Sequence, residues 1–168
     1  MRLNTLFCAV FILLHCTWAN VWAQNVRGIK ILDYGIYHAK IVEKVDTEKT
    51  ATGDRNIIET TGIIKRTTDI PASVGTRFGI LYVVEGEPSG ETVELKKITI
   101  YPKTGLKNPH KKGVVYKSEY AIEAEIGIEG HSGYGFDYEW EAVPGEWMIQ
   151  LWYKGKKLAE KTFTVRKP

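Results

Sequence analysis

A glycine-rich segment carries the residues whose types come closest to catalytic chemistry. It runs from Gly130 to Gly135 and places His131 beside Ser132. A nucleophile elbow requires glycines two positions before and two positions after the serine, on a strained turn from strand to helix. Tyr134 occupies the later position and no helical pattern follows. We therefore interpret the segment as a loop between two strands, and we predict no catalytic residue and no enzyme activity.

The sequence gives no support to metal or cofactor chemistry. His38, His110 and His131 lie on separate segments without the close spacing of zinc ligands. There is no calcium-loop motif of alternating acidic residues. The cysteines, Cys8 and Cys16, both fall in the N-terminal stretch that we expect to be removed. We predict no metal site and no cofactor.

Charge is distributed unevenly along the second half of the chain. Residues 96–117 contain seven lysines and no acid, whereas residues 118–153 contain eight acids and no lysine or arginine. We single out five of these acids as candidate binding residues: Glu123, Glu125, Asp137, Glu139 and Glu141. Their distribution predicts either a structural arrangement that separates like charges or a surface that binds a charged partner.

The acids would repel one another if their strands were neighbours, by about 0.2–1 kcal/mol for each facing pair. Three arrangements relieve that cost: strands in different sheets, acidic strands beside lysine-rich ones, or acids around a cation. A fourth interpretation is a bipolar surface that steers a charged protein partner. The sequence leaves these alternatives open.

Two tryptophans near the C-terminus offer an aromatic surface. Alternation along the strand places Trp147 on one face with Ile149 and Leu151, and Trp152 on the opposite face. One of the two is expected to point outward, where it would stack on a sugar ring or a partner side chain. The alternative is that both belong to the core. We name Trp147 and Trp152 as candidate binding residues and a glycan as an alternative ligand.

The N-terminus has the pattern of a removable export signal over residues 1–23. Arg2 gives a positive start, and the apolar run from Leu6 to Trp18 is too short to span a membrane. Val21 and Ala23 provide small residues at the −3 and −1 positions, which predicts cleavage before Gln24. We expect a protein without a transmembrane segment after cleavage, exported to the periplasm or secreted.

The composition of the chain limits the kind of fold and function that residues 24–168 can have. The chain has 168 residues, of which 43% are hydrophobic and 26% charged, and these values are typical of one globular domain. The formal net charge of +3 is too small and too dispersed for a nucleic-acid binder. We expect a single domain that acts as a monomer.

Alternating apolar and polar residues predict an all-β fold. We expect strands over 29–32, 35–45, 57–65, 78–84, 93–101, 114–128, 136–142, 147–153 and 158–165. The alternation changes phase at Lys96 and Lys97, which predicts a β-bulge there. Seven to nine strands at this spacing are typical of an immunoglobulin-like antiparallel β-sandwich.

Four runs resemble the bacterial family known as domain of unknown function 3859. They are Asp-Tyr-Gly-Ile-Tyr at 33–37, Ile-Pro-Ala-Ser-Val-Gly-Thr-Arg-Phe-Gly at 70–79, the segment 134–140, and the closing run 143–165. The resemblance covers most of 29–165 and implies a small sandwich in an exported or cell-envelope protein. It carries over no catalytic residue. We expect a non-enzymatic binding or accessory module of the bacterial envelope with an envelope protein as partner, or alternatively a glycan-binding module.

Overall fold

The computed structural model describes residues 25–167, apart from the side chains of Thr60 and Thr61, so the predicted signal at 1–23 lies outside it. Within this range the chain forms nine strands and one short 3-10 helix. They are β1 (Asn25–Asp46), β2 (Asp54–Arg66), β3 (Asp69–Pro71), β4 (Arg77–Glu87), β5 (Thr92–Ile100), β6 (Lys117–Glu125), β7 (Glu129–Gly135), η1 (Glu139–Glu141), β8 (Gly145–Tyr153) and β9 (Lys156–Arg166). None of the helical structure in 25–167 is long and apolar enough for a membrane span.

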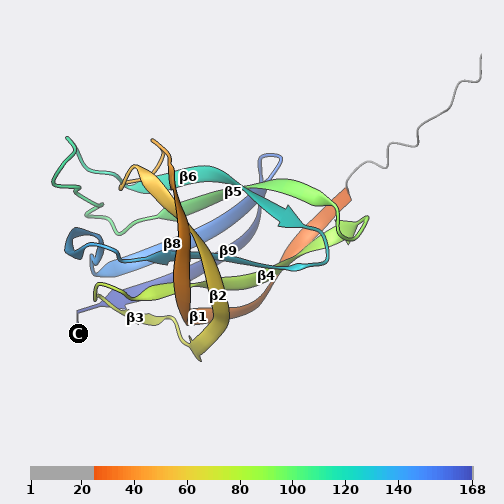
Figure 1. Ribbon diagram of the computed structural model, residues 1–168, viewed down its shortest axis with the longest axis horizontal. Coiled ribbons are helices and arrows are strands. Elements are labelled where there is room, and N and C mark those ends of the chain that lie inside the picture. The colour runs from red at the N-terminus through yellow and green to blue at the C-terminus, as the bar shows by residue number, and fades with distance from the viewer. Residues whose placement is uncertain (1–24, 168) are drawn as a thin grey trace, which may run out of the picture.

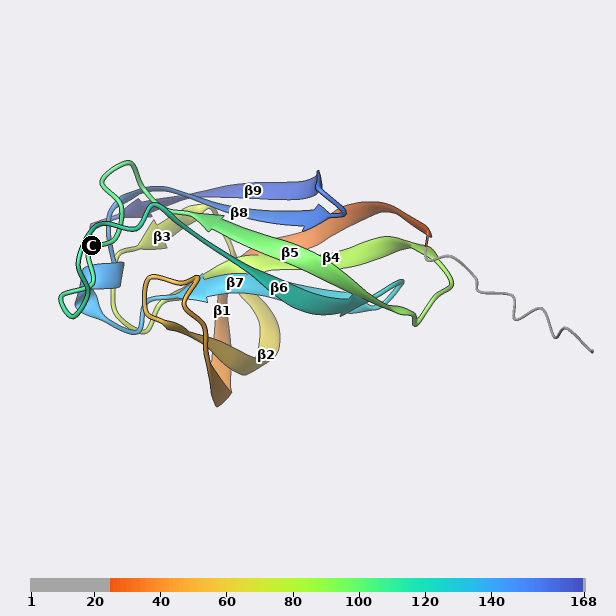
Figure 2. The same cartoon turned by 90° about the horizontal axis from the view of Figure 1, so that it is seen from above.

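The strands form two sheets that pack face to face. Sheet A has the order β2-β1-β4-β7, and sheet B has the order β3-β9-β8-β5-β6. Figure 2 shows β8 and β9 on one side of the molecule and β4 and β7 on the other. The predicted all-β sandwich is confirmed. Its strands pair antiparallel except β3, whose three residues pair in parallel with β9, and one isolated parallel bridge joins Val84 and Ile126.

The core fills the space between the sheets. Alternate residues of β4, beginning with Phe78 and Ile80, are fully buried and face sheet B. They meet Trp147, Ile149 and Leu151 of β8, which are also fully buried. Burying a large apolar side chain contributes about 1.5–3 kcal/mol, so this layer holds the two sheets together.

A long hairpin leaves sheet A and crosses the sandwich. The first half of β1 pairs with β4 as far as Ile36, and its second half pairs with β2. We call residues 37–63, the outer part of this hairpin, the arm. Figure 1 shows the arm running steeply across the other strands. Gly35 lies two residues before the arm and has a φ of +143°. A Cβ atom added to Gly35 would lie 2.0 Å from the Lys65 carbonyl oxygen, so the close approach requires glycine.

Hydrogen bonds fasten the tip of the arm to the far sheet. The Lys49 carbonyl accepts from the Glu119 amide at 3.2 Å, and the Ala51 carbonyl accepts from the Asn108 side chain at 3.0 Å. Glu119 belongs to β6, the edge strand of sheet B. The arm therefore bridges the open side of the sandwich between sheet A and β6.

The predicted bulge at Lys96 and Lys97 is wrong. The pairing of β5 with β6 runs without interruption from Thr92 to Ile100. Regular alternation therefore buries Lys97 and Thr99 on the inner face. The apolar pattern changes phase because the interior becomes polar at this end of the sandwich.

Two further expectations about segments are wrong. Residues 130–135, predicted as a loop, belong to β7, where small residues allow close pairing with β4; an added Cβ on Gly79 would lie 2.4 Å from the Ser132 carbonyl oxygen. Residues 136–142, predicted as a strand, pair with no strand and contain η1. There burial does not follow the alternation of aromatic and acidic residues, because Glu141 is buried and Tyr138 is exposed.

Candidate functional site

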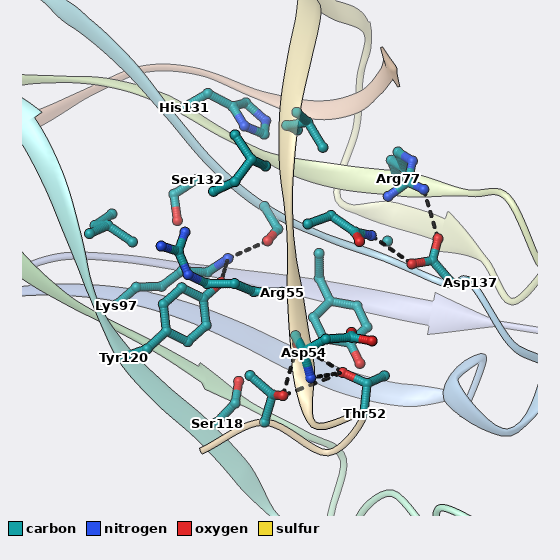
Figure 3. A pocket seen from close by; sticks show the side chains of 18 of the residues that line it. Thr52, Asp54, Arg55, Arg77, Lys97, Ser118, Tyr120, His131, Ser132 and Asp137 are labelled. Atoms are coloured by element: carbon teal, nitrogen blue, oxygen red, sulfur yellow. Dashed lines mark hydrogen bonds and ion pairs between the residues drawn. The ribbon is translucent and has the colours of Figure 1, made fainter. Parts of the chain in front are cut away.

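A cleft of about 710 Å³ lies between the arm, β7 and β6. Consecutive residues line it on each side, namely 54–58 of β2, 120–123 of β6 and 131–135 of β7. Neighbouring side chains of a strand point to opposite faces, so a strand that contributes consecutive residues presents its edge to the cleft. Figure 3 shows the side chains that converge there from the arm and from both sheets.

One wall of the cleft is fixed by a chain of three polar groups. The carboxylate of Asp137 accepts one hydrogen bond from the Arg77 guanidinium and another from the Asn56 amide, each at 2.7 Å. The Arg77 and Asp137 side chains are largely buried, with 13% and 22% exposed. A charge-assisted bond in such surroundings is stronger than an exposed ion pair. These two hydrogen bonds hold the arm, through Asn56, against the end of β7.

Lys97 spans the gap between the two sheets. Its residue is only 6% exposed, and its ammonium group donates to the Tyr120 hydroxyl at 2.9 Å and to the Gly133 carbonyl. Lys97 lies on β5 of sheet B and Gly133 on β7 of sheet A. The buried cation thus connects the edges of both sheets beside the cleft, as Figure 3 shows.

Three buried polar atoms on lining residues have no hydrogen-bond partner among the described residues: Asn56 Oδ1, His131 Nε2 and Ser132 Oγ. Burial, helped by the nearby charge of Lys97, lowers the pKa of His131 to about 4, so its ring is neutral at neutral pH. His131 packs edge-on against Tyr37 with ring centroids 4.2 Å apart. Because Ser132 is its neighbour on a strand, the two side chains point to opposite faces and form no nucleophile–base pair.

Glu141 is a buried structural group. It is 2% exposed, and its carboxylate accepts from the Tyr134 hydroxyl at 2.7 Å and from two backbone amides, at Asp137 (2.8 Å) and Tyr138 (2.9 Å). Burial raises the pKa of Glu141, while these hydrogen bonds act in the opposite direction. We had expected an exposed binding residue; instead, Glu141 organises the turn after β7.

The other candidate acids are spread over three places. Glu123 is exposed on β6 and lines the cleft. Asp137, which follows β7, also lines the cleft. Glu125 is exposed at the end of β6, and Glu139 is exposed on η1. The structure therefore brings Glu123, Asp137 and Glu141 to one cleft and leaves the other two outside it.

The acidic segments follow the two structural arrangements expected for them. β6 belongs to sheet B and lies beside β5, which carries Lys96 and Lys97, whereas η1 follows β7 of sheet A. Within the acidic segment 118–153, one residue faces a like charge across a strand pair, because Glu123 lies opposite Glu94. Among residues 25–167 no cluster of three or more histidine, aspartate or glutamate side chains could hold a metal ion.

The two candidate tryptophans have different surroundings. Trp147 is fully buried, contacts the rings of Phe78, Tyr101 and Phe136, and donates to the Val143 carbonyl at 2.9 Å. No ligand can stack on Trp147 in this structure. Trp152 is half-buried on the outer side of sheet B and donates to the side chain of Gln150. The hypothesis of an aromatic platform is retained for Trp152.

Sequence reasoning missed the cations of the cleft, Arg55 and Lys97, and it considered Ser132 only as a nucleophile. The break in alternation at Lys97 was a usable signal for a polar interior, which we interpreted as a bulge. Arg55 gave no signal, because its position depends on the path of the arm across the sandwich.

The two packed sheets define an immunoglobulin-like β-sandwich, modified by the arm. The chain is similar in structure to an immunoglobulin-like protein from Pseudomonas aeruginosa, with 24% sequence identity and a TM-score of 0.55; the match covers 82% of this chain and 96% of that one. The chain belongs to the family described as domain of unknown function 3859 (DUF3859), whose family model matches residues 25–165. No match was found among curated proteins.

Proposed function

We propose that the protein is an exported, non-enzymatic binding module of the bacterial cell envelope and that its ligand occupies the cleft under the arm. The observation that carries this proposal is the unpartnered buried hydroxyl of Ser132 in the lining of the cleft. Leaving a buried polar group unsatisfied costs about 1–3 kcal/mol. A ligand that hydrogen-bonds to this hydroxyl would recover that free energy.

The dimensions and surroundings of the cleft support the same function. Its volume of about 710 Å³ falls within the roughly 300–1,000 Å³ range of small-molecule sites. Export is supported by the signal pattern at 1–23. A non-enzymatic role is supported by the opposite orientations of His131 and Ser132. We expect the module to act as a monomer.

A second candidate is a surface for an envelope protein partner around η1. Tyr138 is 46% exposed beside the exposed acid Glu139, and its ring stacks on Trp140 with centroids 5.9 Å apart. Aromatic side chains next to charges are typical of protein interfaces. Trp152, on sheet B, would belong to a separate surface.

Hydrogen exchange tests the cleft directly. The purified protein is incubated with separate glycan, peptide and lipid fractions of a bacterial envelope, and amide exchange is followed by mass spectrometry. We expect one fraction to slow exchange at 54–58, 118–123 and 131–135, since a bound ligand would cover these edges. Slowing confined to 136–141 would instead support the partner surface around η1.

Two matched tryptophan substitutions provide the control. Ala121→Trp adds a bulky ring at an exposed position that lines the cleft, whereas Val42→Trp adds the same ring to the arm at a position 48% exposed and outside the lining. Ala121→Trp should abolish the protection and Val42→Trp should preserve it. Unchanged exchange of the cleft residues with every fraction would contradict the proposed function.

A further inference from the structure

One side of the cleft gathers two positive charges at a single aromatic ring. The Arg55 guanidinium lies 5.6 Å from the centroid of the Tyr120 ring, and the Lys97 ammonium lies 5.3 Å from it. Arg55 comes from the arm and Lys97 from the inner face of sheet B. The folded chain therefore brings together two cations that are 42 residues apart in sequence, as Figure 3 shows.

Neither cation is neutralised by the described part of the chain. The ion pairs found between residues 25 and 167 include neither Arg55 nor Lys97. Both hydrogen-bond partners of Lys97, Tyr120 and Gly133, are uncharged. A buried charge without a counter-ion is unfavourable, so this place is suited to an anion.

A buried hydroxyl completes the set of donors. Ser132 is 3% exposed and its Oγ has no partner among the described residues. Figure 3 shows its hydroxyl on the same side of the cleft as Arg55, Lys97 and Tyr120. An arginine, a lysine and a serine together present several N–H and O–H donors, and such donors bind carboxylate or phosphate oxygens through short, charge-assisted hydrogen bonds.

Five carboxylates line the cleft and fall into two groups. Three have partners, and the first of these, Asp54, lies 3.9 Å from the Lys44 ammonium. Asp137 is bonded to Arg77 and Asn56, and Glu141 to Tyr134 and to two backbone amides. In contrast, Glu94 and Glu123 are exposed on facing positions of β5 and β6. Each lies three residues from Lys97 or Tyr120 in an uninterrupted pairing, so their side chains point to the outer face of sheet B, away from the two cations.

We propose that the cleft binds an organic anion larger than a single ion, whose carboxylate or phosphate group is held by Arg55, Lys97 and Ser132. This inference rests on the proposed function and specifies its ligand class. A neutral ligand of the same size lacks the group that would neutralise the two cations. The volume of about 710 Å³ accommodates more than a single ion.

Calorimetry with three probes tests the proposal. Trigalacturonate carries carboxylates, glucose 6-phosphate carries a phosphate, and maltotriose is neutral. We expect trigalacturonate or glucose 6-phosphate to bind about tenfold or more tightly than maltotriose, since one hydrogen bond to a charged group changes affinity by at least that factor. The preferred acidic probe identifies whether the anionic group is a carboxylate or a phosphate. Equal affinity for all three would overturn the proposal.

Charge-removing substitutions identify the residues. Arg55→Gln should weaken the acidic probe about tenfold or more, with little effect on folding because Arg55 is only partly buried. Arg27→Gln is the matched control, since Arg27 forms an exposed ion pair with Glu87 outside the cleft. An equal effect of both substitutions, or no effect of Arg55→Gln, would overturn the assignment. Lys97→Met serves as a second variant, read by the same titration once circular dichroism shows it to be folded.

The outcomes separate this inference from the proposed function. If an envelope fraction protects the cleft but neither acidic probe binds, the assignment of an anionic ligand fails and the proposed function stands. If no fraction protects the cleft and no probe binds, both fail. Binding of an acidic probe that shifts the amide NMR signals of 131–135 and depends on Arg55 supports both.

Discussion

At the scale of single residues, burial gives His131 a stability effect that depends on pH. The pKa of His131 falls from 6.5 to about 4 on folding, mainly through burial and secondarily through the charge of Lys97. The unfolded chain therefore takes up a proton below about pH 6.5, whereas the folded protein does so only near pH 4. The folded state therefore loses stability as the pH falls from about 6.5 to about 4, and His131 carries no such penalty above this range.

We expect the free energy of unfolding to fall by up to about 3 kcal/mol between pH 7 and pH 4 from this group, at roughly 1.4 kcal/mol for each pKa unit. His131→Phe keeps an aromatic ring against Tyr37 and removes the titration. Urea denaturation of both proteins at pH 7, 5.5 and 4 measures the difference. Parallel pH profiles for His131→Phe and the unsubstituted protein would disprove the role of His131.

At the scale of elements, the arm depends on the backbone at Gly35. A φ of +143° is open to glycine and strained for other residues, and an added Cβ would collide with the Lys65 carbonyl oxygen at 2.0 Å. Backbone strain of this kind costs about 1–3 kcal/mol, and the collision adds to it. We expect Gly35→Ala to destabilise the protein by more than about 2 kcal/mol in chemical denaturation.

Gly75→Ala separates the two contributions. Gly75 has a φ of +87° with no atom within 4 Å of an added Cβ, so its substitution carries the backbone strain without the collision. Gly35→Ala should be the more destabilising of the two. If Gly75→Ala proves equally destabilising, close packing at the base of the arm contributes nothing.

The elements that the sequence predicted are those whose patterns are local. Alternation and Pro or Gly turns located β4, β8 and β9, since each pairs with neighbours that bury one regular face. β7 was missed because Gly130, Gly133 and Gly135 weaken any local strand signal. Its strand form arises from pairing with β4 along its whole length, which no short window of sequence contains.

At the scale of the whole molecule, the arm is held by few contacts at its tip. The bond from Asn108 to the Ala51 carbonyl is buried, and its loss leaves that carbonyl without this partner. We expect Asn108→Ala to speed amide exchange in residues 46–54 by about tenfold, which corresponds to the roughly 1.4 kcal/mol range of one buried hydrogen bond. Exchange in the core strands β4 and β8 should be unchanged, and a uniform increase across the protein would contradict an independently anchored arm.

The candidate site could be predicted only in part, because its residues come from segments that are distant in the sequence. The acids Glu123 and Asp137 were identified from charge order and do line the cleft. Arg55, Lys97 and Ser132 belong to three segments that come together only after the arm crosses the sandwich. A site made by tertiary crossing leaves no spacing in the sequence from which it could be read.

The contact between Lys97 and β7 also bears on how copies of this protein behave toward one another. β7 is the last strand of sheet A, and a free strand edge is a template on which a second chain can add by β-pairing. The Lys97 ammonium occupies the Gly133 carbonyl of that edge, and residues 54–58 of the arm line the cleft beside it. The same cation and hairpin that shape the cleft would therefore hinder the addition of a second strand along β7.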